Sequence, residues 1–371
     1  MSKLFSPIRV GPYELKHRVV MPPLTRLRAD PDDTASAMMA EHYKQRASDG
    51  GLIIVESAMI SVEARAYDGA PGLYRDEHVA GYRRIADGVH SKGGVVIAQL
   101  AHNGRTSHVE MNGGVPPLGP SIVPLDAQAL TPTGWKPVSP GREATVDDIK
   151  RVIDDFRAAA RRAFDADIDG VEIHAANGYL LDSFLQDGTN RRTDRYGGAV
   201  ENRARILIET VEAIGSLRGF DRVGVRLSPS GEWNSIHDSD PETTFRRVAE
   251  LLDPYGLAYL HVIEPRVKGD DDKVDSLDHP PVASAFLRNH FSGPIIAAGG
   301  FRDAAGAEET LQRGDADLIA FGRWFTSNPD LPERLRRGLP LTKYDRSAFW
   351  GGDGRAYVDF LPWQGAEASV A

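Results

Sequence analysis

Three residues able to do chemistry follow a short apolar stretch: His174, Asn177 and Tyr179 stand within "GVEIHAANGYLLDSF", separated by small residues. In an extended strand, positions three apart point to opposite faces, so His174 and Asn177 could not reach one ligand. They could if the strand ends at His174 and the chain curls into a helical turn. Two neutral hydrogen-bond donors aimed at one oxygen polarise a carbonyl, and a phenol can protonate the neighbouring carbon. The alternative is a structural corner, with His174 in a core hydrogen bond and Tyr179 capping the next helix.

Polar side chains also stand where other predicted strands end. Thr25 follows the first strand, Gln99 ends the third, and Arg226 lies in the fifth. Each has a structural explanation alone: a turn residue, a bond to a neighbouring strand, or an ion pair with a carboxylate such as Glu232. A buried guanidinium is costly without acceptors, however, and several unmet polar groups at one end of a fold favour a polar ligand.

Glycines mark the ends of the last two predicted strands, in "AAGGF" and "AFGRWF". Close backbone approach at glycine, together with an arginine, is typical of a phosphate site at this corner of a barrel, although the glycines could simply turn tight loops. A phosphorylated cofactor held here would extend toward the strand-end side chains, which suit an isoalloxazine ring and make FMN the best fit. The candidate phosphate ligands are Gly299, Gly300, Gly322 and Arg323.

The elements that must position these residues alternate along the chain. Strands are predicted at 18–22, 52–57, 95–100, 170–174, 223–228, 258–263, 294–299 and 318–322. Helices are predicted at 77–92, 146–167, 200–217, 241–254, 304–314 and 328–337, the second with Thr145 as its N-cap. Eight apolar strands separated by helices predict an α/β fold, a closed (β/α)8 TIM barrel, with an open doubly wound sheet as the alternative.

Two further segments complete the predicted architecture, a single domain over residues 1–371. "PIRVGPYELKHRV" (7–19) contains a Gly-Pro turn and predicts an N-terminal hairpin that plugs the bottom of the barrel. The Gly- and Pro-rich stretch 103–144 follows the third strand and predicts a long capping loop, either a lid or a disordered insert.

Composition excludes several classes of function. A net charge of −9 argues against nucleic acid as a partner. The absence of cysteine excludes disulfides, thiolate nucleophiles, Cys-ligated zinc and iron–sulfur clusters. No metal is expected: the acidic runs 30–33 and 270–272 lack the spacing of a calcium loop and are interpreted as solvated loops. No signal peptide or run of 18 apolar residues is present, so no membrane partner is expected and cytoplasmic residence is the default expectation.

The sequence resembles the old yellow enzymes, FMN-dependent ene-reductases that include N-ethylmaleimide, pentaerythritol tetranitrate and 12-oxophytodienoate reductases. The resemblance covers nearly the whole chain. It rests on motifs such as "MPPLTRLR", "GLIIVESAMIS", "AQLAHNGR", "GVEIHAANGYLLDSFLQDGTNRRTDRYGGAVENRAR", "VRLSPSGEW" and "AFGRWFTSNPDLPERL". The fold that it implies, an FMN-binding (β/α)8 barrel, agrees with the prediction from the residues.

The resemblance also implies roles for individual residues. The residues expected to line the flavin ring and ribityl chain are Pro23, Leu24, Thr25, Ala58, Gln99 and Arg226. The same four glycine-segment residues would hold the phosphate. His174 and Asn177 match the pair that binds the substrate carbonyl or nitro oxygen, Tyr179 matches the proton donor, and Trp350 matches an aromatic residue near flavin and substrate.

The sequence departs from the family pattern at three places. Ala101 stands where many members have Trp and is expected to reshape that side of the pocket. Trp350 stands where Tyr is common, so a hydroxyl contact is lost there. Thr25 stands where one branch has Cys and indicates the branch without it.

These matches imply an NADPH- or NADH-dependent enzyme with bound FMN that reduces activated alkenes and also accepts nitro compounds or nitrate esters. Phenols are expected as ligands, and the chain as a monomer or homodimer. Two alternatives stay open at this stage: an FMN α-hydroxy-acid oxidase using a His base, and a non-catalytic flavin- or phenol-binding protein. A dienoyl-CoA-type reductase, whose relatives carry an iron–sulfur cluster, is excluded by the missing cysteines.

Overall fold

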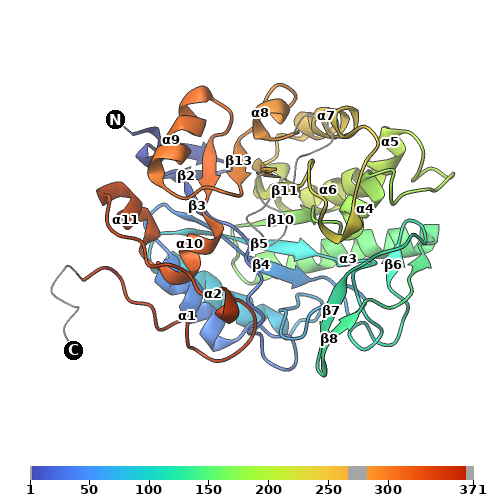
Figure 1. Ribbon diagram of the computed structural model, residues 1–371, viewed down its shortest axis with the longest axis horizontal. Helices are drawn as coiled ribbons and strands as arrows, with labels where there is room; N and C mark the ends of the chain where they lie inside the picture. Colours follow the sequence, from blue (N-terminus) through green and yellow to red (C-terminus); the bar gives the residue numbers. More distant parts are fainter. Residues whose placement is uncertain (1, 266–281, 365–371) are drawn as a thin grey trace.

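Eight parallel strands form a closed barrel in the computed structural model, which describes residues 2–265 and 282–364 (Figure 1). Each strand pairs with the next along the chain, and the last pairs with the first. The barrel strands are β3 (Val19–Met21), β4 (Leu52–Met59), β5 (Val95–Ala101), β10 (Gly170–Ala175), β11 (Val223–Leu227), β12 (Tyr259–Ile263), β13 (Ile295–Ala298) and β14 (Leu318–Ala320). The predicted barrel is confirmed and the open sheet is wrong. The acidic run 270–272 lies outside the described residues.

Helices surround the strands (Figure 1), which explains why the strands are buried on both faces. The helices are α1 (Ala37–Arg46), α2 (His78–His90), α3 (Val146–Asp165), α4 (Leu180–Leu185), α5 (Val200–Arg203), α6 (Arg205–Arg218), α7 (Pro241–Leu252), α8 (Ser284–Leu287), α9 (Ala304–Arg313), α10 (Gly322–Ser327) and α11 (Leu331–Arg337). All six predicted helical regions are helical, and Thr145 caps α3 in a reciprocal capping box with Asp148. The helix α1 was not predicted, because its buried face includes His42 and Arg46 and so hides the apolar period.

The predicted hairpin plugs the bottom of the barrel. Strands β1 (Ile8–Val10) and β2 (Tyr13–Leu15) pair antiparallel, and Val10 and Leu15 share a core cluster with inward residues of the barrel such as Leu52 and Ile97. The N-terminal end of the barrel is therefore filled by apolar side chains. This packing leaves the opposite end for chemistry.

A register shift between Val55 and Ala58 interrupts the pairing of β4 with β5. Such a bulge re-aims the side chains of the bulged strand. Here it brings Glu56 and Ser57 to a cavity at the carboxyl end of the barrel.

The capping loop 103–144 contains regular secondary structure. It contains the hairpin of β7 (Gln128–Thr131) and β8 (Gly134–Pro137), and the short parallel pair β6 (Leu118–Gly119) and β9 (Arg142–Glu143). The expectation of a disordered insert is therefore wrong. The hairpin projects beside the barrel mouth (Figure 1).

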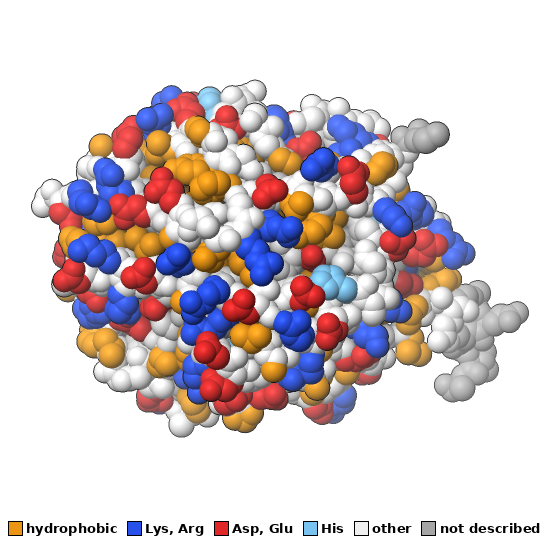
Figure 2. Space-filling view, turned by 180° about the vertical axis from the view of Figure 1, so that it is seen from behind, with side chains coloured by type: hydrophobic (Ala, Val, Ile, Leu, Met, Phe, Trp, Pro, Cys, Tyr) orange, Lys and Arg blue, Asp and Glu red, His pale blue; other side chains and the backbone are white. Residues whose placement is uncertain are grey.

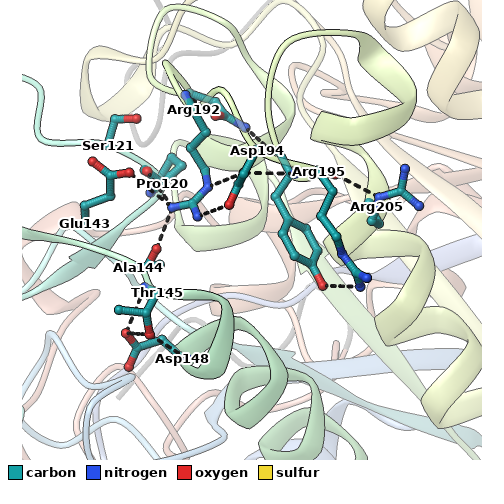
Figure 3. Close-up of polar contacts among 12 residues, drawn as sticks. Pro120, Ser121, Glu143, Ala144, Thr145, Asp148, Arg192, Asp194, Arg195 and Arg205 are labelled. Carbon is teal, nitrogen blue, oxygen red and sulfur yellow. Dashed lines mark hydrogen bonds and ion pairs between the residues drawn. The ribbon is translucent and has the colours of Figure 1, made fainter.

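One buried arginine fastens this cap to the barrel (Figure 3). The guanidinium of Arg192 donates to the carbonyl oxygens of Ala144, at 2.5 Å, and Pro120, at 3.2 Å. It also pairs with the carboxylate of Asp194 at 2.5 Å. Because its donors reach the residue that follows each strand of the parallel β6–β9 pair, Arg192 fixes the carboxyl end of that pair.

On the face shown in Figure 2, basic and acidic side chains are interspersed. No helix in the described part of the chain is long and apolar enough to cross a membrane, and residues 2–265 and 282–364 contain no group of three or more side chains suited to bind a metal. The solvated-loop interpretation fails at Asp33, which is buried and pairs with Arg65 at 3.1 Å.

Candidate active site

The strand that opens the site ends one residue later than predicted, and the turn after it is left-handed. β10 runs to Ala175, after which Asn177 has φ 60° and Gly178 has φ 73°. A Cβ at position 178 would lie 2.7 Å from the carbonyl oxygen of Trp233, so glycine is required there on two grounds. The curl predicted from the spacing is confirmed, but it is not a helical turn.

Side-chain hydrogen bonds stabilise the turn at Asn177 and Gly178. The amide of Asn177 donates to the hydroxyl of Ser228 at 2.8 Å, and the amide of Gly178 donates to the carboxylate of Asp182 at 2.8 Å. Asp182 also accepts from Ser228 and Gln186. Burial raises the pKa of Asp182 to about 6, and these donors only partly oppose the effect.

Two cavities meet at the carboxyl end of the barrel. The larger, of about 1100 Å³, opens to solvent beneath the β7–β8 hairpin, and the smaller, of about 80 Å³, reaches between the strand ends. Residues that line both are Pro23, Thr25, Tyr67, Asn177, Tyr179 and Arg226. One continuous site thus joins the strand-end cluster to the capping loop.

His174 is buried at the wall of the smaller cavity, with its ring centroid 5.2 Å from that of Tyr179 at an angle of 80°. Burial, together with the charges of Arg226 and His261, keeps the pKa of His174 well below its usual value. The imidazole is therefore neutral near pH 7. The interpretation of His174 as a satisfied core residue finds no support, since its Nδ1 has no hydrogen-bond partner among the described residues.

Arg226 is the second buried group with an unmet donor. Its Nε has no partner in the described part of the chain, and its side chain lines both cavities. Burial lowers the pKa of Arg226, and the carboxylate of Glu172 opposes the shift. A polar ligand with acceptors at this position would satisfy the guanidinium, as an isoalloxazine ring does.

Tyr179 is paired with a residue that the sequence did not single out. The hydroxyl oxygens of Tyr179 and Tyr67 lie 3.2 Å apart. Burial raises the pKa of Tyr179 above its usual value, and the bond from Tyr67 and the charge of Arg226 reduce this rise. The phenol is therefore protonated at neutral pH and can act as an acid.

A polar row crosses the barrel just below this site. Gln99 donates to Glu172 at 2.7 Å, and Glu172 pairs with His261 at 2.8 Å. The hydroxyl of Ser57 donates to the amide oxygen of Gln99. The side-chain amide of Gln99 is therefore hydrogen-bonded through both its nitrogen and its oxygen.

The structure brings most of the predicted site residues to the cavities. Those that line one or both are Pro23, Leu24, Thr25, Gln99, His174, Asn177, Tyr179, Arg226, Arg323 and Trp350. Ala58 is buried and lines neither, although its neighbours Ser57 and Met59 do.

The three predicted phosphate glycines also lie outside the lining of these two cavities. Gly299 and Gly300 have φ 104° and 73°, a backbone that favours glycine. Gly322 packs closely on the first strand end, since a Cβ there would lie 3.2 Å from the side chain of Leu24.

The departures from the family pattern differ in their surroundings. Ala101 is fully buried and lines neither cavity. Trp350 lines the larger cavity, and its ring centroid lies 6.0 Å from that of Trp135.

Sequence reasoning missed four residues of the site: Tyr67, Trp135, Glu172 and His261. Glu172 and His261 carried a usable signal, because a charged or polar residue in the middle of an apolar strand needs a partner. Tyr67 stands in a loop and Trp135 in β8, both distant from Tyr179 in sequence, and no local pattern marks them.

Comparison with known proteins extends these observations. The family model described as the NADH:flavin oxidoreductase / NADH oxidase family matches residues 3–342. A flavin oxidoreductase, hxnT, from Emericella nidulans is 40% identical over 97% of both chains. The 12-oxophytodienoate reductase 2 of Arabidopsis thaliana is 38% identical over 94% of this chain and 92% of its own.

The chain belongs to the old yellow enzyme family. Its fold superposes on an old yellow enzyme homologue from Zymomonas mobilis with a TM-score of 0.92 and 40% identity, over 97% of this chain and 99% of that one. Morphinone reductase, solved with tetrahydroNAD, gives a TM-score of 0.90 and 40% identity over 99% of each chain. As a member of this family the chain is a nicotinamide-dependent flavin oxidoreductase with FMN as cofactor, which confirms the prediction.

Proposed function

We propose that this enzyme reduces activated C=C bonds of α,β-unsaturated carbonyl or nitro compounds, and that it also accepts nitrate esters. The observation that carries the proposal is the convergence of His174, Asn177 and Tyr179 on one cavity, with a buried ring nitrogen of His174 that has no hydrogen-bond partner among the described residues. NADPH or NADH is the reductant. The enzyme acts as a single FMN-binding domain, in a monomer or homodimer.

Bound FMN would supply the redox chemistry, the transfer of a hydride from the reduced nicotinamide to the β-carbon of the alkene. Its ring and ribityl chain would be held by Pro23, Leu24, Thr25, Ala58, Gln99 and Arg226. Its phosphate would be held by Gly299, Gly300, Gly322 and Arg323. The unmet Nε of Arg226 supports this placement, because a ring carbonyl or nitrogen would accept from it.

His174 and Asn177 bind the substrate oxygen. A neutral imidazole and a carboxamide both donate a hydrogen bond without carrying charge, so they stabilise the negative charge that develops on the oxygen as the β-carbon is reduced. The left-handed turn supports this role, since it brings Asn177 back to the cavity that His174 lines. Trp350 supplies an apolar wall for the rest of the substrate.

Tyr179 donates the proton to the α-carbon. A buried phenol suits this step, because the enolate is strongly basic and the pKa of Tyr179 is raised by burial. Tyr67 donates to the resulting phenolate oxygen, which lowers the cost of the charge that Tyr179 acquires.

Stopped-flow kinetics of Tyr179→Phe test the proposal. Reduction of the flavin by NADPH is expected to keep its wild-type rate, whereas reoxidation by 2-cyclohexenone is expected to slow by about 10²- to 10⁴-fold, the range for loss of a general acid. Equal slowing of both half-reactions would remove Tyr179 as the proton donor. A wild-type enzyme whose reduced flavin no alkene reoxidises would contradict the proposed activity itself.

Phenol binding tests the oxygen site separately. A phenolate oxygen resembles the developing enolate, so replacing His174 and Asn177 together by Ala is expected to weaken its binding by at least tenfold. The measurement is a spectral titration of the oxidised enzyme with 4-hydroxybenzaldehyde. An unchanged dissociation constant would show that His174 and Asn177 do not bind the substrate oxygen.

A further inference from the structure

A fully buried carboxylate lies below the proposed ring site and takes no part in the chemistry described so far. Glu172 stands in the middle of β10, and its two oxygens face two neighbouring side chains of the barrel interior. Oε1 accepts from the amide of Gln99 on β5 at 2.7 Å, and Oε2 accepts from Nδ1 of His261 on β12 at 2.8 Å. A single acidic group thus joins three strands.

This contact decides the orientation of two groups. An amide can turn by 180° and exchange its donor for its acceptor. In Gln99 the nitrogen is committed to Glu172 and the oxygen to the hydroxyl of Ser57, so only one orientation satisfies both neighbours. In His261 the proton stands on Nδ1, and Nε2 has no partner among the described residues.

The carboxylate also acts electrostatically on Arg226. Arg226 lies in register with His174 on one side and His261 on the other. Burial alone raises the pKa of Glu172, but the contact with His261 and the charge of Arg226 outweigh it, so the pKa is lowered and the group is ionised. Glu172 in turn opposes the fall in the pKa of Arg226.

We propose that Glu172 is a positioning residue of the flavin site: it fixes the amide of Gln99 and, as the counter-charge of Arg226, reduces the positive potential that the bound ring meets. The inference rests on the proposed placement of the ring against Gln99 and Arg226. A reduced flavin carries negative charge near N1, so a nearby buried carboxylate disfavours reduction. Without it, the bound flavin becomes easier to reduce.

The test is the midpoint potential of the bound flavin, measured anaerobically against a reference dye in FMN-loaded enzyme. Glu172→Gln is expected to shift the potential to a more positive value. Glu172→Asp keeps the charge and is expected to stay near the wild-type potential while binding FMN about tenfold more weakly, because its shorter side chain loses a charge-assisted bond to Gln99. Asp169→Asn is the matched control, since Asp169 lies just before the other end of β10 and pairs with His90 there.

A Glu172→Gln potential equal to that of wild type, or shifted no more than in Asp169→Asn, overturns the proposal. If Glu172→Gln does not accumulate as folded protein, Glu172→Asp decides: unchanged FMN affinity overturns it, and weakened affinity at an unchanged potential supports it. The variant Arg226→Lys distinguishes a wrong role for Glu172 from a wrong placement of the flavin ring. An effect of Arg226→Lys without one of Glu172→Gln rejects only the role of Glu172, whereas no effect of either rejects the placement of the ring. None of these measurements uses an alkene, so they stand apart from the substrate proposal.

Discussion

The hydroxyl oxygens of Tyr67 and Tyr179 lie 3.2 Å apart, although 112 residues separate them in the chain. Tyr67 comes from the loop after β4, and Tyr179 precedes α4. Burial, followed by the proximity of Tyr179, keeps the pKa of Tyr67 well above its usual value. Tyr67 therefore keeps its proton at neutral pH and is able to donate to its neighbour.

Tyr67→Phe is expected to slow alkene reduction about five- to tenfold, the value of one hydrogen bond of roughly 1 kcal/mol to a phenolate. Reduction of the flavin by NADPH should be unaffected, because the hydroxyl that this variant removes is bonded to Tyr179 and takes no part in the proposed hydride transfer. The rates of the two half-reactions by stopped flow check this. A loss in the alkene step as large as that of Tyr179→Phe would instead make Tyr67 the direct proton donor.

The buried carboxyl of Asp182 makes stability depend on pH. Its pKa is about 6 in the folded protein because burial disfavours the charged form, against about 3.9 in an unfolded chain. Between pH 4 and 6 the folded state therefore holds the proton more tightly, and this group reduces the free energy of unfolding as the pH rises through that window.

Asp182→Asn is expected to remove that decline. Relative to wild type, its unfolding free energy should increase by about 2–3 kcal/mol between pH 4 and pH 7, on top of a constant loss from altered hydrogen bonds. Urea denaturation at several pH values measures the difference, with the exposed Asp154→Asn on α3 as control. Parallel profiles for wild type and Asp182→Asn would contradict the shift.

Arg192 should contribute far more to stability than its neighbour Arg195. Its guanidinium is buried and bonded to two carbonyl oxygens and Asp194, so Arg192→Ala leaves several acceptors without a donor and is expected to cost about 3–5 kcal/mol. Arg195→Ala removes an exposed ion pair with Glu209 and should cost at most about 1 kcal/mol. Thermal unfolding compares the stability of the two variants. Similar losses of stability would show that the buried contacts of Arg192 stabilise the fold no more than the exposed ion pair of Arg195.

Trp135 is expected to select for substrates that carry a ring. It is half-exposed on the hairpin, and its centroid lies 6.1 Å from Tyr67 and 6.0 Å from Trp350. Trp135→Ala removes one aromatic face from the wall of the larger cavity, so KM for an aryl-substituted enone should rise about threefold to tenfold while KM for 2-cyclohexenone is retained. Ile122→Ala, exposed in the same loop, is the control. Equal changes in KM for the two substrates would show that Trp135 does not select for substrates that carry a ring.

The barrel was predictable because its strands are short apolar runs between helices, and the turn at Asn177 was predictable because two polar residues three apart needed a common face. The left-handed conformation was not, since it depends on Trp233 and Asn234 crowding Gly178 from another loop. Polar residues at strand ends were recognised, whereas Glu172 was overlooked inside a strand whose neighbours are apolar. The order in the capping loop was missed because it arises from tertiary contacts such as those of Arg192, which lies outside that loop.

Backbone hydrogen bonds fasten the β7–β8 hairpin to the loop that carries Tyr67. The amide of Asp68 donates to the carbonyl oxygen of Leu130 at 2.8 Å, and the amide of Leu130 donates to that of Ala66 at 3.1 Å. Trp135 in the wall of the larger cavity and Tyr67 beside Tyr179 therefore stand on one backbone-bonded unit, so a substitution that loosens the hairpin is expected to disturb both aromatic side chains at once.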